Sequence, residues 1–252
     1  MVMEREQEEG GPTPRQKIVL AAAELLESEG LEALSTRAVA ARAGVPAPTI
    51  FRLFGDKYGL LEELAQHGFE RYLGRKARFF TAGDPVQNLR DAWDLHVDFG
   101  LRHPEYYSLV YCQVRPGYMP QAGHAAAAGL RHMMTKVAAA GRLRMGVTRS
   151  AEVMHSAGMG TVLTLTALPE DERDLRTSHV ARDMVIDALT LPAEKQNGGA
   201  ASNGLPSTGL AHRAVALLAT LEQGDDAAVL SPGERTLLCE WLNRLADSGQ
   251  SA

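Results

Sequence analysis

The stretch Ala43–Lys57, AGVPAPTIFRLFGDK, decides how the N-terminal part of the chain folds. Pro46 and Pro48 have no amide proton and push the residues before them toward extended backbone, so one continuous helix cannot run through this stretch. The pattern predicts a helix that ends at Gly44 and a second helix of two turns from about Pro48 to Phe54. Two short helices joined by a tight turn form a helix-turn-helix, whose second helix enters the DNA major groove.

The two faces of this second helix differ in chemistry. At about 100° per residue, Ile50 and Phe54 share one face, and Thr49 and Arg52 share the opposite one. We therefore expect the apolar pair to pack against neighbouring helices and the polar pair to face a partner. Ala47, expected at the helix cap, has no side-chain oxygen, so we expect the amides of Thr49 and Ile50 to be open to a phosphate.

Charge is distributed unevenly along the chain. The 252 residues carry a formal net charge of -5 at pH 7, which argues against a protein covered in basic charge. Between residues 35 and 57 the balance reverses, and the ionisable side chains there are Arg37, Arg42, Arg52 and Lys57 against Asp56 alone. A local basic patch on an acidic protein is typical of a small DNA-reading element.

The run from about Arg15 to Leu64 resembles the N-terminal domain of the TetR family of bacterial transcriptional regulators. The resemblance is carried by an Ala-rich first helix ending at Gly30, the pair Ser35-Thr36, the turn Ala43-Gly44-Val45, the run Thr49-Ile50-Phe51, Phe54, and Asp56-Lys57 before Leu60-Leu61. It implies a three-helix N-terminal domain that binds double-stranded operator DNA, and a homodimer. It also implies a repressor whose larger C-terminal domain binds a small molecule that weakens operator binding.

By position, the resemblance assigns DNA contacts to the start of the second helix, to the recognition helix and to a lysine just after it. The residues so predicted are Ser35, Thr36, Arg37, Ala47, Thr49, Phe51, Arg52, Leu53 and Lys57, the last as a phosphate contact. Two of them depart from the family pattern. Tyr is commoner where Phe51 stands, so a hydroxyl contact to the DNA backbone is missing. Leu53 stands where a polar or aromatic residue is commoner, and it suggests contact with a thymine methyl.

The remainder of the chain is predicted to be helical throughout, which makes the protein all-α. Helix starts are marked by a capping residue followed by proline at Thr13-Pro14, Asp84-Pro85 and Ser231-Pro232. Apolar residues at helical spacing predict helices at about 85–102, 104–114, 119–141, 149–168, 171–191, 210–222 and 232–247. No alternating strand pattern of any length appears in the sequence.

Composition divides the chain into four parts. We expect a helix-turn-helix DNA-binding domain at residues 13–60, a helical ligand-binding and dimerisation domain at 61–191, and a two-helix C-terminal extension at 210–248. Residues 192–209 are rich in Gly, Ser, Asn and Pro and lack apolar spacing, so we expect a flexible linker there.

Aromatic, sulfur-containing and histidine side chains concentrate in the predicted ligand-binding domain. Ligand pockets are mostly apolar with a few polar groups, so we expect a bulky, largely apolar small molecule to bind there. The predicted ligand-binding residues are Trp93, His96, Phe99, Tyr107, Tyr111, Met133, Met134, His155 and Met159. The same residue types equally make up a helical core, and this alternative stays open.

The predicted helix 149–168 carries small residues beside large apolar ones. In the family, two late helices of each chain form a four-helix bundle in the dimer, and the equivalents here are 149–168 and 171–191. A glycine inside a helix costs up to about 1 kcal/mol relative to alanine, a cost that a close helix crossing offsets. We therefore expect the dimer interface at Met154, Ala157, Gly158, Val162 and Leu165. The alternative is that the glycines pack against the chain's own core.

Other function classes find little support in the sequence. No run approaches the roughly 18 apolar residues of a membrane span, and the acidic start MVMEREQEEGG lacks the apolar stretch of a signal peptide, so we expect a cytoplasmic protein. His124, His132 and His155 lack metal-ligand spacing, Cys112 and Cys239 are far apart, and no nucleophile–base arrangement is visible. We expect no metal, no cofactor and no enzyme activity. The alternative function is a helical small-molecule- or partner-binding protein that has lost specific operator binding.

Overall fold

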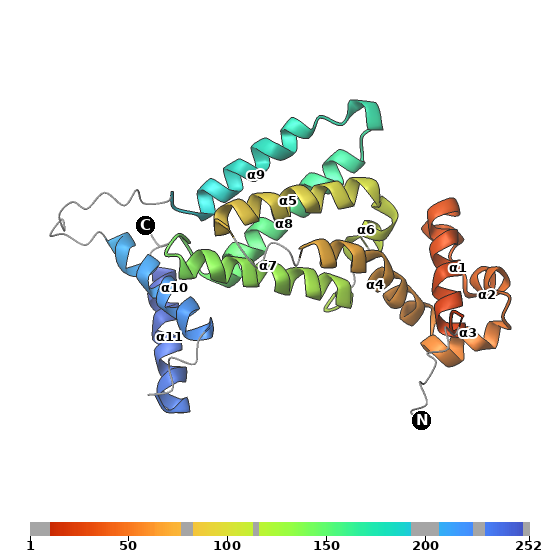
Figure 1. The fold of residues 1–252 in the computed structure, drawn as a ribbon, viewed down its shortest axis with the longest axis horizontal. Helices are drawn as coiled ribbons and strands as arrows, with labels where there is room; N and C mark the ends of the chain where they lie inside the picture. The colour runs from red at the N-terminus through yellow and green to blue at the C-terminus, as the bar shows by residue number, and fades with distance from the viewer. Residues whose placement is uncertain (1–10, 77–82, 113–115, 193–206, 224–229, 249–252) are drawn as a thin grey trace, which may run out of the picture. The chain divides into compact units, whose positions relative to one another are not determined.

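The computed structural model describes residues 11–76, 83–112, 116–192, 207–223 and 230–248. Within these residues every regular element is a helix (Figure 1), and an isolated antiparallel bridge pairs Leu143 with Thr190. The predicted all-α fold is therefore confirmed. Most of the predicted linker 192–209 lies outside the described residues.

The chain divides into two compact units, one within Met1–Arg71 and His103–Gly123 and the other within Tyr72–Arg102 and His124–Ala252. The first unit holds α1 (Pro14–Glu29), α2 (Thr36–Ala43), α3 (Ala47–Phe54), most of α4 (Lys57–Lys76) and α6 (Pro104–Tyr111). The second holds α5 (Pro85–Arg102), most of α7 (Gln121–Ala139), α8 (Val147–Thr166), α9 (Leu175–Leu189), α10 (Ser207–Gln223) and α11 (Pro232–Ser248). The predicted domain boundary at residues 60 and 61 stays a prediction.

Polar side chains start several of these helices where the sequence predicts them. The Thr13 hydroxyl accepts a hydrogen bond from the Gln16 amide, and the Gln16 side-chain oxygen accepts one from the Thr13 amide, which completes a capping box on α1. Ser35 accepts from the Ala38 amide at 3.1 Å and so begins α2. Asp56 accepts from the Gly59 amide at 2.8 Å at the first turn of α4. These bonds fix the boundaries of the helix-turn-helix.

The boundaries of α8 and α9 differ from the predicted ones. Helix α8 begins at Val147 and ends at Thr166, two residues earlier than predicted at each end. Helix α9 begins at Leu175 rather than 171, because residues Glu170–Glu172 form a separate 3-10 turn. The Asp174 carboxylate caps α9 by accepting a hydrogen bond from the Arg176 amide at 2.9 Å.

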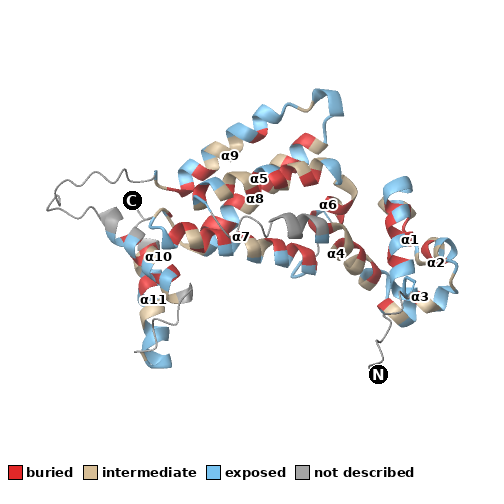
Figure 2. Ribbon diagram, in the orientation of Figure 1, coloured by how far each residue is buried: buried red, intermediate tan, exposed pale blue. Residues whose placement is uncertain are grey.

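Each unit has its own apolar core, which Figure 2 shows as the buried stripes of the helices. In the first unit, α1 buries Ile18, Ala22 and Leu26. In the second, α5, α7 and α8 bury a longer list that includes Leu89, Trp93, Met134, Val137, Met154 and Val162. Helix α9 is exposed over most of its length, so it lies at the surface of the second unit.

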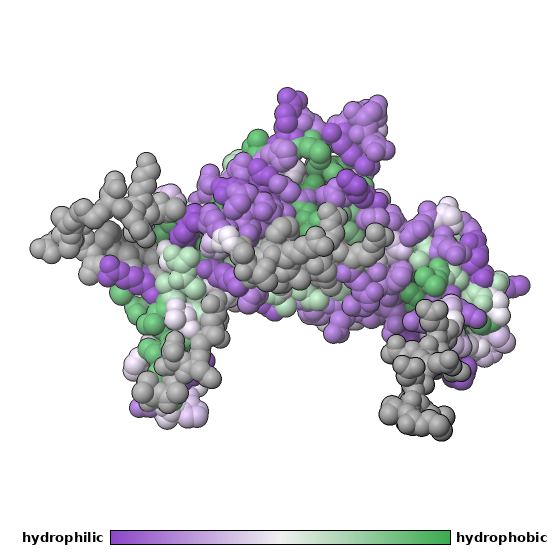
Figure 3. All heavy atoms as spheres, viewed as in Figure 1, coloured by the Kyte–Doolittle hydropathy of each residue, from purple (hydrophilic) through white to green (hydrophobic). Residues whose placement is uncertain are grey.

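Helices α10 and α11 pack on each other as a hairpin. Its small core consists of Ala214, Leu218 and Leu242, with Leu221, Leu238, Cys239 and Leu245 packed against it. Apolar surface remains over both helices (Figure 3), where Leu210, Leu217, Leu237 and Trp241 are exposed.

Candidate DNA-binding surface and ligand cavity

Helix α3 has one buried and one exposed face, as its sequence predicts. Ile50 is completely buried and Phe54 is nearly so, whereas Phe51 is 52% exposed and Arg52 is exposed. Arg15 of α1 fastens the end of the helix: its guanidinium donates a hydrogen bond to the Leu53 carbonyl at 2.8 Å and lies 4.8 Å from the centre of the Phe54 ring. The exposed face of α3 therefore belongs to a helix whose opposite face is fixed by packing and by Arg15.

The N-terminus of α3 offers fewer free amides than expected. The helix begins at Ala47 with Pro46 as its cap, and Pro46 makes no side-chain hydrogen bond. The Thr49 amide is not open to a phosphate, because it donates to the Pro46 carbonyl at 2.9 Å. The expectation of a free Thr49 amide is wrong, because this amide is already hydrogen-bonded to a carbonyl within the turn.

The basic patch is smaller than the sequence suggests. Arg42 pairs with Glu29 of α1 at 2.9 Å, with Glu24 also within 3.8 Å, so its charge is already compensated. Among the residues that the structure describes, no carboxylate forms an ion pair with Arg37, Arg52 or Lys57, all of which are exposed. These three cations make up the free positive charge of the helix-turn-helix.

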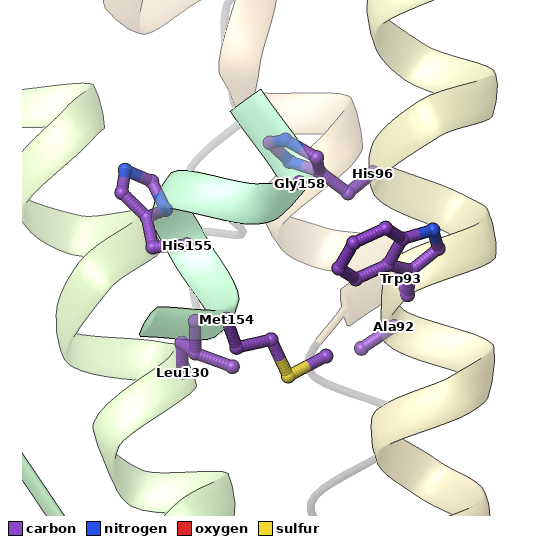
Figure 4. Close-up of a pocket in the computed structure, with 7 residues that line it drawn as sticks. All are labelled: Ala92, Trp93, His96, Leu130, Met154, His155 and Gly158. Carbon is purple, nitrogen blue, oxygen red and sulfur yellow. The ribbon is translucent and has the colours of Figure 1, made fainter. Parts of the chain in front are cut away.

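A cavity lies between α5, α7 and α8 in the second unit (Figure 4). Its volume is about 20 Å³, room for about one water molecule, and it is lined by Ala92, Trp93, His96, Leu130, Met154, His155 and Gly158. The rings of His96 and His155 have their centres 6.3 Å apart, so two imidazoles stand beside a mostly apolar wall. A side chain at Gly158 would intrude, because its Cβ would lie 3.3 Å from His96 Cδ2 and 3.9 Å from Trp93 Cζ3.

Residues 18–64 match the family model of the bacterial regulatory proteins of the tetR family. The match spans α1, α2 and α3 and the start of α4, the same helices that present Phe51 and Arg52. The chain carries the N-terminal domain of the TetR family. No curated protein matches the sequence.

Solved structures share the fold over most of the chain. A protein of unknown function from Rhodococcus sp. RHA1 is 25% identical, with a TM-score of 0.61, and the similarity covers 74% of this chain and 100% of that one. A TetR/AcrR-family regulator from Thermobifida fusca YX-ER1 is 19% identical, with a TM-score of 0.53 and coverage of 69% and 96%. FadR from Bacillus subtilis, solved with stearoyl-CoA, is 15% identical, with a TM-score of 0.57 and coverage of 68% and 96%.

The residues predicted to contact DNA all lie in the TetR-family domain, at the start of α2, along α3 and at the start of α4. Ser35, Arg37, Ala47, Phe51, Arg52 and Lys57 are exposed, and Thr36, Thr49 and Leu53 are half-buried. The Ser35 hydroxyl accepts a hydrogen bond from the Ala38 amide, so it has a structural role as the cap of α2. Contact of this set with DNA stays a prediction.

The predicted ligand-binding residues divide between the two units. Trp93, His96 and His155 line the cavity, together with Ala92 and Leu130, which the sequence analysis missed. Phe99, Met133 and Met134 are buried and Met159 is half-buried, but none of these four lines the cavity. Leu130 precedes Met133 and Met134 by one helical turn, and this spacing was the one signal that could have found it.

Tyr107 and Tyr111 lie in the first unit, where their rings pack 4.7 Å apart, and Tyr111 also packs edge-on against Phe69 at 5.9 Å. Burial raises the pKa of Tyr111, so its hydroxyl stays neutral. The prediction that these two tyrosines line the cavity is wrong, because α6 belongs to the core of the first unit. They are core residues, the alternative that the sequence left open.

Most side chains predicted to form the dimer interface do not lie on the surface of the chain. Met154, Gly158, Val162 and Leu165 are buried within the single chain, and Ala157 is half-buried. Gly158 makes room for His96 and Trp93 of the same chain, so the alternative reading of this glycine is confirmed. Gly160, in contrast, is exposed, with open space where a Cβ would be added.

The described residues contain neither a membrane-spanning helix nor a metal-binding cluster. None of these helices is long and apolar enough to cross a membrane. No group of three or more His, Cys, Asp or Glu side chains there is placed to hold a metal ion.

Proposed function

We propose that this TetR-family chain is a transcriptional repressor that binds operator DNA through α2 and α3 and is released by a small, largely apolar molecule. The observation that carries the proposal is the outward face of α3. Phe51 and Arg52 are exposed on a short helix whose other face is buried, and Arg52 forms no ion pair with a carboxylate among the described residues. An exposed aromatic side chain beside an uncompensated cation fits a partner that offers both apolar and anionic groups. The DNA major groove offers both.

The side chains divide between positioning and reading the DNA. Lys57, at the start of α4, holds a phosphate as a point charge. Arg52 reads a base edge, and Phe51 and Leu53 contact thymine methyl groups, because neither has a polar atom to offer a base or a phosphate. The chain acts in the cytoplasm, where operator DNA is available, and its role is regulatory rather than catalytic.

The test separates these two kinds of contact. The DNA upstream of the protein's own gene and a random duplex of the same length are titrated by fluorescence anisotropy at several salt concentrations. Arg52→Ala should cost about 1–3 kcal/mol of binding free energy on the operator and little on random DNA. Lys57→Ala should weaken both equally and reduce the salt slope by about one unit. Arg131→Ala, which removes an exposed cation from α7 in the other unit, is the charge-matched control and should change neither.

Equal losses on both DNAs would remove Arg52 from sequence reading. If the wild-type protein binds neither DNA while a ligand still raises its melting temperature, the chain is the small-molecule-binding protein of the alternative function. For a ligand-released repressor, stabilisation and release go together, with a coupling of about 1–3 kcal/mol.

The lining of the cavity indicates the chemistry of the effector. Its volume of about 20 Å³ holds about one water molecule, so an effector must displace side chains that line it, and this lining is mostly apolar with two imidazoles. The stearoyl-CoA seen in the structure of Bacillus subtilis FadR is far larger than this space. We therefore keep the largely apolar ligand expected from the sequence and propose that the walls of the cavity move apart to admit it. Native mass spectrometry of the purified protein would detect a co-purifying molecule and give its mass.

We further propose that the homodimer forms through the outer faces of α8 and α9. Leu163 on α8 is exposed, and Val180 and Met184, one turn apart on α9, are among the most exposed large apolar side chains of the described residues, at 58% and 70%. Exposed apolar side chains at helical spacing on two adjacent helices are what a bundle interface requires.

Met184→Glu would place a charge in this interface and should shift the protein to monomer in sedimentation velocity. Operator binding should be lost at the same time, because two half-sites need two recognition helices at a fixed separation. Leu210→Glu, at an exposed leucine of α10, is the matched control. A dimer that survives Met184→Glu but not Leu210→Glu would move the interface to the hairpin.

A further inference from the structure

Trp93 of α5 contributes to two structures at once. Its ring lines the cavity beside Gly158 (Figure 4), and its indole Nε1–H donates a hydrogen bond to the hydroxyl of Ser178 on α9 at 3.0 Å. Both residues are 2% exposed, so the bond is made out of contact with water. A buried N–H that loses its acceptor is costly, because no water replaces the lost partner. The bond therefore ties one wall of the cavity to α9.

The C-terminal half of α9 is firmly anchored. It contains Ile186 and Leu189, the two buried apolar residues of the helix. The chain just beyond it is also held by backbone hydrogen bonds: the Arg144 amide donates to the Leu189 carbonyl at 2.9 Å, and the Leu191 amide donates to the Arg142 carbonyl at 2.8 Å. This end of α9 is fixed by both burial and backbone pairing.

The N-terminal half of α9 has a single buried anchor, Ser178. Ion pairs also join α9 to α5, from Arg182 to Asp94 at 2.6 Å and from Arg90 to Asp183 at 3.5 Å. The two carboxylates are nearly half exposed, and ion pairs of this kind contribute little to stability. Ser178 is thus the point at which this half of the helix is held most specifically.

We propose that Trp93 transmits occupancy of the cavity to α9. A compact apolar ring that enters beside Gly158 pushes the indole aside, breaks the Trp93–Ser178 hydrogen bond and releases the N-terminal half of α9 from α5, while the C-terminal half stays fixed. The consequence for DNA rests on the proposed function, because the released half includes Val180, and Met184 follows it on the proposed dimer face. Moving that face changes how two chains meet and hence the spacing of their recognition helices.

The first experiment measures amide hydrogen exchange along α9 in the full chain, without DNA or effector. Ser178→Ala removes the acceptor and adds nothing to the cavity. Amide exchange in residues 175–182 should become about three- to tenfold faster, as expected for the loss of one buried hydrogen bond, and exchange in residues 185–189 should not change. Thr177→Ala, at the exposed neighbour of Ser178, is the matched control and should have no such effect.

The second experiment fills the cavity with a larger side chain introduced by substitution. In Gly158→Leu the added Cβ lies 3.3 Å from His96 and 3.9 Å from Trp93, and the leucine extends beyond its Cβ, so we expect it to displace both side chains. It should speed exchange in residues 175–182 as Ser178→Ala does, and the double variant should be no faster than either single one, because the bond can be broken only once. Gly160→Leu, which points into open space, is the control. If the leucine variant does not fold, the Ser178→Ala measurement tests the proposal without it.

The proposal is overturned if Ser178→Ala leaves exchange in residues 175–182 unchanged, or if the two substitutions multiply in the double variant. Both results are obtained on free protein, so they do not depend on whether an operator is found. If α9 loosens as expected but the wild-type chain binds no DNA, the proposed function fails and the link from Trp93 to α9 stands.

Discussion

The recognition helix α3 and the cavity between α5, α7 and α8 are built in opposite ways. The side chains that orient α3 lie within a few turns of chain, apart from Arg15, which reaches Leu53 and Phe54 from α1. The cavity instead brings Ala92 on α5 together with Gly158 on α8, and it closes only when three helices pack. The difference shows that an outward-facing site follows from a local pattern, whereas an inward-facing site depends on which helix faces which.

The largest expected effect on stability comes from a substitution on the buried face of α3. Ile50→Ala removes a completely buried side chain and should lower the free energy of unfolding by about 2–5 kcal/mol. Phe51→Ala, at the adjacent exposed residue, should leave that free energy within about 0.5 kcal/mol of wild type and instead weaken operator binding. Urea titration followed by circular dichroism measures the first effect, and anisotropy measures the second. Similar losses of stability in both variants would mean that α3 does not have two distinct faces.

A smaller effect is expected where α4 and α6 approach each other in the first unit. A Cβ added at Gly68 would lie 2.1 Å from Cδ1 of Tyr106, whose ring is buried and whose hydroxyl donates to Glu27 at 2.9 Å. The ring cannot turn away without losing that bond, so Gly68→Ala should destabilise the chain by about 1–3 kcal/mol. Gly160→Ala, on the exposed side of α8, should instead stabilise it by up to about 1 kcal/mol. Thermal melting of the two variants decides between them, and an unchanged melting temperature for Gly68→Ala would contradict the close contact.

The helix-turn-helix could be predicted because its signals are local. Pro46 and Gly44 mark the turn, Ser35 and Asp56 cap helices, and the spacing of Ile50 and Phe54 gives the buried face. Long-range pairing is what the sequence could not supply. Arg42 counts as a free cation along the chain, but in the structure it is compensated by carboxylates of α1.

The cavity could be predicted only in part, for the same physical reason. Trp93, His96 and His155 do line the cavity, because aromatic and imidazole side chains are typical of pockets, but their contact with a ligand stays a prediction. Composition could not show that Tyr107 belongs to the other unit, because both cores use the same residue types. Nor could it show what Gly158 makes room for: a small residue indicates a close approach, but the sequence does not say which side chain approaches.

The smallest expected effect concerns acid, which should loosen α9 and leave the buried face of α3 unchanged. The hydrogen bond from Arg182, with the charges of Arg182 and Arg90, lowers the pKa of Asp183 below its ordinary value. A carboxylate whose pKa is lower in the folded state stabilises the fold above its unfolded pKa of about 3.9, and that contribution is lost as the pH falls through the folded pKa. Ile50 and Phe54 themselves carry no group that titrates. Arg15, which holds the end of α3, is paired with Glu63 at 2.5 Å, so the contrast applies to the buried face of α3 alone.

Asp183→Asn tests this sign directly. The side chain of Asp183 is 48% exposed, so at pH 7 the variant should be less stable than wild type by no more than about 1 kcal/mol. The difference in urea midpoint between the two proteins should shrink as the pH falls below about 4, because the wild-type carboxyl group is then neutral as well. Other carboxylates protonate equally in both proteins, so they cancel in the difference. A difference that stays constant down to the lowest pH at which both proteins fold would mean that Asp183 holds α9 by shape rather than by charge.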